Sequence, residues 1–190
     1  VHAQRAQDHQ ASDGYTGAIY GQYLFKNDYY STAIVSYGQN DNDSQRWVGN
    51  GYSVADFDSD ILSMRLATGK KIWFGSMMLQ PVLEFNFSDI TVDSYSESGS
   101  LAALSVDKQD YGIVELGFGA TVGQDFEVGQ TLLRPELKAA VYHDFEQDSV
   151  QITSAFSAGG NSFVTTGAKA DANRYNLKAS LSWMLNDTSN

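Results

Sequence analysis

Residues 77–87 read Met-Met-Leu-Gln-Pro-Val-Leu-Glu-Phe-Asn-Phe, with an apolar residue at every odd position of the stretch. The even positions between them are mostly polar, and one of them is a carboxylate, Glu84. A period of two is typical of a β-strand, because successive side chains point to opposite faces. The stretch therefore predicts a strand with one apolar face and one polar face.

Two further stretches, 133–141 and 175–185, alternate in the same way and carry full charges at polar positions. The first two alternating stretches also share a design, in which two glycines and a proline stand six residues apart. The two copies are Gly69, Gly75 and Pro81, and Gly123, Gly129 and Pro135. Sequential strands tend to be neighbours, so two hairpins of one design predict an antiparallel up-and-down meander.

Both prolines stand on the apolar face of an alternating stretch. Proline cannot donate a hydrogen bond to a β-ladder, so each proline predicts a bulge or a local break in strand pairing. The remaining pattern predicts eight or nine strands in all, with polar loops at 39–44 and 93–104. The other expected strands span 14–25, 29–39, 56–68, 111–122 and 150–156.

The composition of the 190-residue chain narrows the class of protein. Its net charge of −11 argues against nucleic-acid binding, which needs a basic surface. The absence of cysteine removes thiol catalysis and thiolate metal sites. No apolar run approaches the roughly 18 residues of a membrane-spanning helix, whereas a membrane β-barrel needs only alternating segments of about ten residues.

Strand length and charge placement favour a membrane barrel. The alternating stretches are longer than the usual strand of about five or six residues, and membrane strands need about nine to eleven. A Lys or Arg facing lipid at the midplane costs about 2–4 kcal/mol, so the charged rows must face inward. The expected lumen-lining residues are Glu84, Arg134, Glu136, Lys138, Arg174 and Lys178. The expected lipid-facing residues are Leu79, Pro81, Leu83, Phe85, Leu137, Leu177, Leu181 and Trp183.

Two alternatives stay open at this point. A soluble β-sandwich or adhesin-like binding module also alternates, with its apolar face in a core. An outer-membrane porin or hydrolase barrel is the second alternative. The inner charges could steer a polypeptide, hold a helix, or simply pair to fill the barrel, as side chains do in small barrels.

The sequence offers little for catalysis or metal binding. His143 and Asp144 are adjacent, and neighbours on a strand point to opposite faces, which disfavours a catalytic dyad. No Gly-x-Ser-x-Gly motif is present. Asp41-Asn42-Asp43 lacks the glycine and glutamate that complete a calcium loop, and we interpret it as a solvated loop. We therefore expect no enzyme activity, no metal and no cofactor.

Several segments, taken in order, resemble the translocator β-domain of bacterial autotransporters, the type V secretion proteins. They are Gly-Ala-Ile-Tyr-Gly-Gln-Tyr at 17–23, the aromatic hairpin to Tyr37-Gly38, the Gly69 turn with Leu-Gln-Pro-Val-Leu at 79–83, Tyr-Ser-Glu-Ser-Gly at 95–99, Leu-Arg-Pro-Glu-Leu at 133–137, Tyr-His-Asp-Phe at 142–145, and the Phe- and Gly-rich segment 156–167.

The resemblance implies a twelve-stranded barrel in the Gram-negative outer membrane that exports an N-terminal passenger. It also implies three partners, which are outer-membrane lipid, the passenger polypeptide and the barrel-assembly machinery. The expected domains are a polar N-terminal loop or tail at 1–13, the barrel at 14–186 and a polar tail at 187–190. We expect the chain to be a barrel truncated at both ends, because neither a linker helix nor the family's final aromatic strand is evident.

Overall fold

The alternating stretches form strands β5 (Met77–Val92), β10 (Thr131–Asp144) and β13 (Asn173–Leu185) of one antiparallel sheet. The computed structural model describes residues 8–49, 51–129, 131–146, 149–169 and 171–185. The other long strands are β1 (His9–Leu24), β2 (Tyr29–Trp47), β3 (Tyr52–Lys70) and β8 (Gln109–Gln124). The strand order β1-β2-β3-β5-β8-β10-β13 follows the chain, so the predicted all-β antiparallel meander is confirmed.

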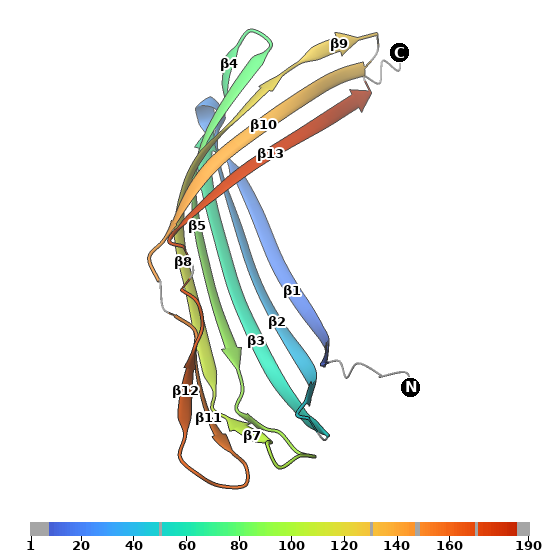
Figure 1. Cartoon of the computed structure of the whole chain (residues 1–190). Coiled ribbons are helices and arrows are strands. Elements are labelled where there is room, and N and C mark those ends of the chain that lie inside the picture. Colours follow the sequence, from blue (N-terminus) through green and yellow to red (C-terminus); the bar gives the residue numbers. More distant parts are fainter. Residues whose placement is uncertain (1–7, 50, 130, 147–148, 170, 186–190) are drawn as a thin grey trace.

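The sheet curves into a half-barrel whose open side lies at the right of Figure 1. Short connections join the strands at one end, including the 3-10 turn η1 (Lys26–Asp28). The long connections from β5 to β8 and from β10 to β13 lie at the other end, together with the short connection from β2 to β3. In the described residues, β1 and β13 are the two edges of the sheet. No helix in this part of the chain is long and apolar enough to cross a membrane.

Both prolines lie at breaks in the ladder, as predicted. β3 pairs with β5 as far as Val82, and the short strand β4 (Ile72–Phe74) pairs again from Leu79, which leaves Pro81 in the gap. In the second copy, β8 and the short strand β9 (Phe126–Val128) leave the same gap opposite Pro135. At these positions the missing N–H costs no ladder hydrogen bond on that side.

Gly75 and Gly129 close the two repeated hairpins. Both have left-handed backbone conformations, with φ of 64° and 66°. Side chains other than glycine rarely adopt this region without cost, so the glycine spacing reflects the turn geometry. The repeat seen in the sequence is therefore a repeat of one strand break and one turn.

The long connections carry a small second sheet of four strands, ordered β12-β11-β7-β6. Only the strand near 150–156 was predicted, and the structure has it as β11 (Gln151–Phe156). The others are β6 (Tyr95–Ser96), β7 (Leu104–Val106) and β12 (Phe163–Thr166). Strands of two to four residues are too short for their alternation to be recognised in a sequence.

Polar residues that the sequence assigned to a loop or to a tail extend strands β1 and β2. The expected loop at 39–44 is the continuation of β2, where Asn40 and Asn42 pair with β1 on one side and β3 on the other. Residues 9–13, assigned to the polar N-terminal tail, belong to β1 because they pair with Asp41–Gln45. Polar residues lengthen these strands beyond the apolar part of the sheet. Residues 1–7 and 186–190, and with them most of both expected tails, lie outside the described residues.

Candidate functional site

Strand pairing assigns every side chain of the sheet to one of two faces. The concave surface, which we call the inner face, includes the even positions of β5, and the convex surface, the outer face, includes its odd positions. Glu84 is 3% exposed on the inner face, whereas its neighbour Leu83 is 47% exposed on the outer face. The alternation in residues 77–87 thus places the polar side chains on the inner face, where Glu84 is buried, and the apolar side chains of the odd positions on the outer face, where Leu83 is exposed.

Glu84 is the centre of a network on the inner face. Its carboxylate accepts hydrogen bonds from Arg65 Nη2 at 2.8 Å, Lys138 Nζ at 2.5 Å and the Tyr142 hydroxyl at 2.6 Å. These donors come from β3 and β10, on either side of β5 and β8. A buried carboxylate with charge-assisted donors on both oxygens is well satisfied, so the network ties together four neighbouring strands.

Glycines on β8 make this network possible. Gly117 lies between Glu84 and Tyr142 in the register of the sheet. A Cβ atom at Gly117 would lie 2.3 Å from Tyr142 Cδ1, and one at Gly119 would lie 2.7 Å from Ala140 Cβ. The bare backbone therefore lets the Tyr142 ring lie across β8 and reach Glu84. Close approach of this kind is a recurring reason for glycine within a strand.

A second ion pair lies beside the first. Arg174 on β13 donates to Glu115 on β8 through Nη2 at 2.6 Å and Nε at 3.1 Å. The Arg174 guanidinium also lies 4.0 Å from the centre of the Tyr142 ring, and Asn86 donates to the same carboxylate at 3.2 Å. Tyr142 thus connects the two networks, and the arginine is held by both a carboxylate and an aromatic face.

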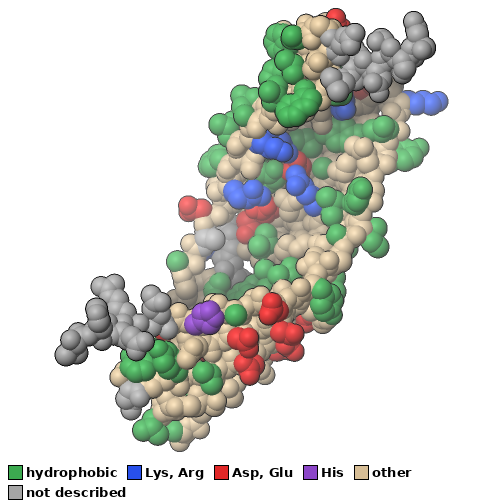
Figure 2. Space-filling view, turned by 90° about the vertical axis from the view of Figure 1, so that its right-hand side faces the viewer, with side chains coloured by type: hydrophobic (Ala, Val, Ile, Leu, Met, Phe, Trp, Pro, Cys, Tyr) green, Lys and Arg blue, Asp and Glu red, His purple; other side chains and the backbone are tan. Residues whose placement is uncertain are grey.

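Arg134 lies nearer the short turns. It forms a bidentate pair with Asp125, with Nη2 at 2.8 Å from Oδ2, and it stacks 5.2 Å from the centre of the Trp73 ring. Ser180 donates to Glu136 over 3.5 Å, a weak contact. Lys178 makes no ion pair within the described residues and faces Lys138 directly across the strands. Two lysines thus face each other at this point of the inner face, in the region where Lys and Arg side chains gather in the upper half of Figure 2.

All six residues predicted to line a lumen lie on the inner face. Glu84, Lys138 and Arg174 belong to the networks described above, and Arg134 pairs with Asp125 beside a turn. Glu136 has the weak contact with Ser180, and Lys178 has no ion pair among the described residues. A hollow of about 380 Å³ on this face is bordered by Arg65, Glu84 and Lys138. The arrangement offers a polar wall with fixed charges. The side chains of His143 and Asp144 lie on opposite faces of β10, where His143 Nδ1 lies 2.9 Å from Asn173 Oδ1 and Asp144 accepts hydrogen bonds from the Val114 and Glu146 N–H groups.

Arg65, Glu115 and Asp125 were not among the residues predicted from the sequence. Arg65 could have been found, because Leu62, Met64 and Leu66 alternate with polar or small residues and place it on the polar side. Glu115 and Asp125 could not be assigned to a face from alternation. Glycines interrupt the alternation of apolar and polar residues around Glu115, and Asp125 lies between two strands.

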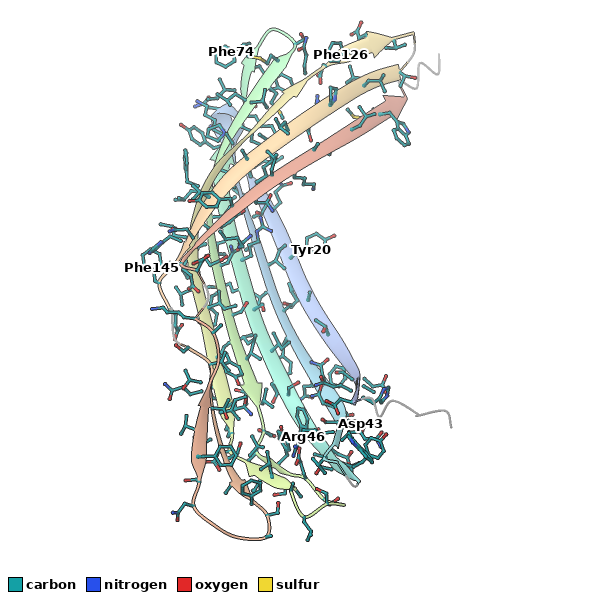
Figure 3. The ribbon with its side chains drawn as sticks, viewed as in Figure 1. Tyr20, Asp43, Arg46, Phe74, Phe126 and Phe145 are labelled. Carbon is teal, nitrogen blue, oxygen red and sulfur yellow. The ribbon has the colours of Figure 1, made fainter. Side chains whose placement is uncertain are left out.

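The eight residues predicted to face lipid all lie on the outer face. The most exposed are Leu177 at 75%, Trp183 at 70%, Leu181 at 57% and Leu137 at 51%. Aromatic side chains stand at the short-turn end, where Figure 3 labels Phe74 and Phe126. A surface this apolar is far beyond the scattered exposed hydrophobic residues of soluble proteins.

Acidic side chains end the apolar part of the outer face at the opposite end. Asp13, Asp41 and Asp58 lie side by side in register on β1, β2 and β3, and Asp43 lies opposite Asp56. On β3, the ten steps from Asp60 to Lys70 span about 33 Å along the strand. At the usual strand tilt of about 40° this becomes a height of about 25 Å, the size of the apolar band in outer-membrane barrels.

The Tyr-Ser-Glu-Ser-Gly segment at 95–99 anchors the small sheet to the ends of β2 and β3. Tyr95 stacks on Phe57 with ring centres 4.4 Å apart, and burial raises the pKa of its phenol, so the ring stays uncharged there. Glu97 pairs with Arg46 Nη2 at 2.5 Å, near the lower end of β2 in Figure 3. Gly99 has φ of 94° and approaches the Tyr52 carbonyl too closely for a side chain. Each conspicuous residue of the segment thus makes a specific contact.

Comparison with known proteins agrees with this architecture. The Autotransporter beta-domain family model matches residues 1–190. No curated protein matches the chain by sequence. Among solved structures, the translocator domain of the autotransporter NalP from Neisseria meningitidis is similar, with a TM-score of 0.65 and 12% identity. That alignment covers 95% of this chain and 69% of the NalP chain.

Proposed function

The chain belongs to the autotransporter β-domain family and is a translocator domain, and we propose that its inner face lines the path along which the passenger crosses the outer membrane. Glu84, Arg134, Glu136, Lys138, Arg174 and Lys178 would form part of that lumen wall. The separation of charge between the two faces carries this proposal. Six of the seven Lys and Arg residues in the long strands described here lie on the inner face.

The apolar side chains of the outer face support a proposal about contact with lipid. We propose that Leu79, Pro81, Leu83, Phe85, Leu137, Leu177, Leu181 and Trp183 contact the acyl chains of outer-membrane lipid. The apolar band of about 25 Å between Asp60 and Lys70 supports this placement. Within the described residues, β1 and β13 each have a strand partner on one side only, and unpaired backbone groups are costly in lipid. The barrel-assembly machinery would have to protect such edges during insertion.

We propose a passive role without catalysis for this chain. The inner face contributes charge and water-accessible surface, and the outer face contributes anchoring. The networks around Glu84 and Glu115 would hold the wall in shape while a polypeptide passes. The positive charge of Lys178, which has no carboxylate partner in the described structure, would remain available to contact that polypeptide.

A photocrosslinking residue placed at 178 or 177 tests the lumen assignment. The two positions are adjacent on β13 and lie on opposite faces. In cells arrested during export, the label at Lys178 is expected to capture the passenger, and the label at Leu177 is expected to capture lipid or nothing. Capture of the passenger from Leu177, or from neither position, would contradict the proposal.

Charge substitution tests the lipid assignment. Leu137→Arg is expected to destabilise the inserted barrel by about 2–4 kcal/mol, because the charge would meet hydrocarbon midway along β10. The matched change Glu136→Gln, one residue earlier and on the inner face, should be tolerated. Measured fractions of heat-resistant, membrane-inserted protein would decide, and equal effects of the two variants would contradict the assignment.

A further inference from the structure

The outer face is not uniformly convex, since an apolar groove of about 590 Å³ crosses β1, β2 and β3 towards β5. Its floor is made by small residues, Gly21, Ser31 and Ala33, which the register places next to one another. Larger side chains stand beside it, including Leu66 and Leu83. The groove has the size of a site for one small apolar ligand.

Gly21 is the residue that opens the groove. It stands between the exposed side chains of Ile19 and Tyr23 on the outer face of β1, and a Cβ added to it would meet no atom within 4 Å. Gly17, on the same face of the same strand, is equally open but does not line the groove. The hollow is therefore a consequence of missing side chains, and it can be filled without a clash.

Lys70, a residue of β3, lies beyond one end of the groove. Thr68 lines it, and Lys70 lies two residues further along the same face of β3, about 7 Å away. The Lys70 ammonium lies 4.7 Å from the centre of the Tyr29 ring, its partner in register. Of the Lys and Arg residues in the long strands described here, Lys70 alone lies on the outer face. Lys and Tyr are also the residues that favour the boundary between hydrocarbon and headgroups.

The two ends of the outer face differ in charge. Lys70 lies at the end with the short turns, which face the periplasm in outer-membrane barrels. The aspartates at 13, 41 and 58 lie at the other end, where an anionic headgroup would be repelled. An amphiphile with an anionic head and an apolar tail is therefore matched at the short-turn end only.

We propose that the groove binds one acyl chain of an anionic glycerophospholipid in the periplasmic leaflet, with the lipid phosphate against Lys70. This inference rests on the proposed placement of the outer face in lipid. It adds a specific site to that placement, because lipid elsewhere on the face would have no lysine or arginine of the long strands beside it. The occupied groove would also cover the backbone beside the edge strand β1.

The test uses the protein folded into phosphatidylcholine vesicles that contain a trace of phosphatidylglycerol with a photoreactive acyl chain. Adducts mapped by mass spectrometry are expected on Tyr23, Leu66 and Leu83 in excess over Leu177 and Leu181. Gly21→Leu should reduce the groove adducts severalfold, and the matched control Gly17→Leu should leave them unchanged. Equal labelling of groove and β13, or equal effects of the two substitutions, would overturn the inference.

A second experiment measures the selectivity for the lipid headgroup and does not depend on filling the groove. Labelling by photoreactive phosphatidylglycerol should exceed labelling by photoreactive phosphatidylcholine, and Lys70→Gln should reduce the preference by about fivefold, the equivalent of about 1 kcal/mol for one basic residue. Lys71→Gln is the matched control. An unchanged preference in Lys70→Gln would overturn the inference. Adducts on inner-face residues such as Lys138 would instead contradict the proposed orientation of the faces.

Discussion

Glu84 and Lys178 both lie on the inner face near the middle of alternating strands, yet their surroundings differ. Glu84 is nearly inaccessible and accepts hydrogen bonds from three side chains on β3 and β10. Lys178 stands on the edge strand β13, exposed, opposite another lysine and without an ion pair in the described residues. The centre of the sheet is thus fixed by paired charges, while its edge keeps a charge available. The comparison separates the structural role of Glu84 from the transport role that we propose for Lys178.

The largest effect is expected from removing the centre of the network. Glu84→Ala would leave Arg65, Lys138 and the Tyr142 hydroxyl without their shared acceptor, at a cost of about 3 kcal/mol. Denaturant unfolding of the protein in lipid vesicles measures this loss. Glu136→Gln is the control, because Glu136 has only the weak contact with Ser180. If Glu84→Ala lowered the free energy of unfolding by less than Glu136→Gln does, Glu84 would not be the structural centre of the inner face.

A methyl group at Gly117 should be the next most damaging change. The Cβ atom of Gly117→Ala would overlap the Tyr142 ring, and displacement of that ring should cost about 2 kcal/mol. Gly21→Ala, which points into open space on the outer face, should be nearly neutral. A double variant with Tyr142→Ala should cost less than the sum of the single changes. Additive losses in that cycle would show that ring and glycine do not interact.

Removal of one hydroxyl should have a smaller effect. Tyr142→Phe keeps the ring across Gly117 and beside Arg174, but deletes the hydrogen bond to Glu84. The expected loss is about 1 kcal/mol, because Arg65 and Lys138 still satisfy the carboxylate. Unfolding midpoints in the same vesicles give the value. If Tyr142→Phe were as damaging as Glu84→Ala, the hydroxyl rather than the ion pairs would hold the centre.

The smallest change in stability is expected at the edge. Lys178→Gln removes no ion pair that the described residues form and relieves repulsion with Lys138, so unfolding should shift by less than about 0.5 kcal/mol. Lys138→Gln is the matched change on the partner strand, and it should cost more because it deletes a contact with Glu84. A slower rate of passenger export in Lys178→Gln, at unchanged stability, would assign this lysine to transport.

The two residues also show what sequence can and cannot predict here. Alternation put both Glu84 and Lys178 on the polar face of a strand, because a period of two follows from backbone geometry. Their partners depend on register across several strands, which no local pattern contains. Arg65 lies 19 residues before Glu84 in the chain and Tyr142 lies 58 after it. The network could therefore not be assembled from the sequence, although the face of its central residue could.

The same limit explains the errors at the strand ends. Asn and Asp residues at 39–44 have low strand propensity, yet they pair on both sides because their neighbours extend equally far. The two prolines, in contrast, were informative, since a missing N–H has the same consequence in any sheet. Features that follow from one residue type, such as the missing N–H of proline, could be predicted from the sequence. Contacts that depend on the pairing of distant strands could not.

Accessibility along β10 is the most direct test of the central claim that one face meets water and the other meets lipid. The chain contains no cysteine, so single cysteines can be placed at each of residues 133–139 in the membrane-inserted protein and treated with a water-soluble maleimide. The account predicts reaction at 134, 136 and 138, and protection at 133, 135, 137 and 139. Uniform reactivity, or the reverse alternation, would contradict it.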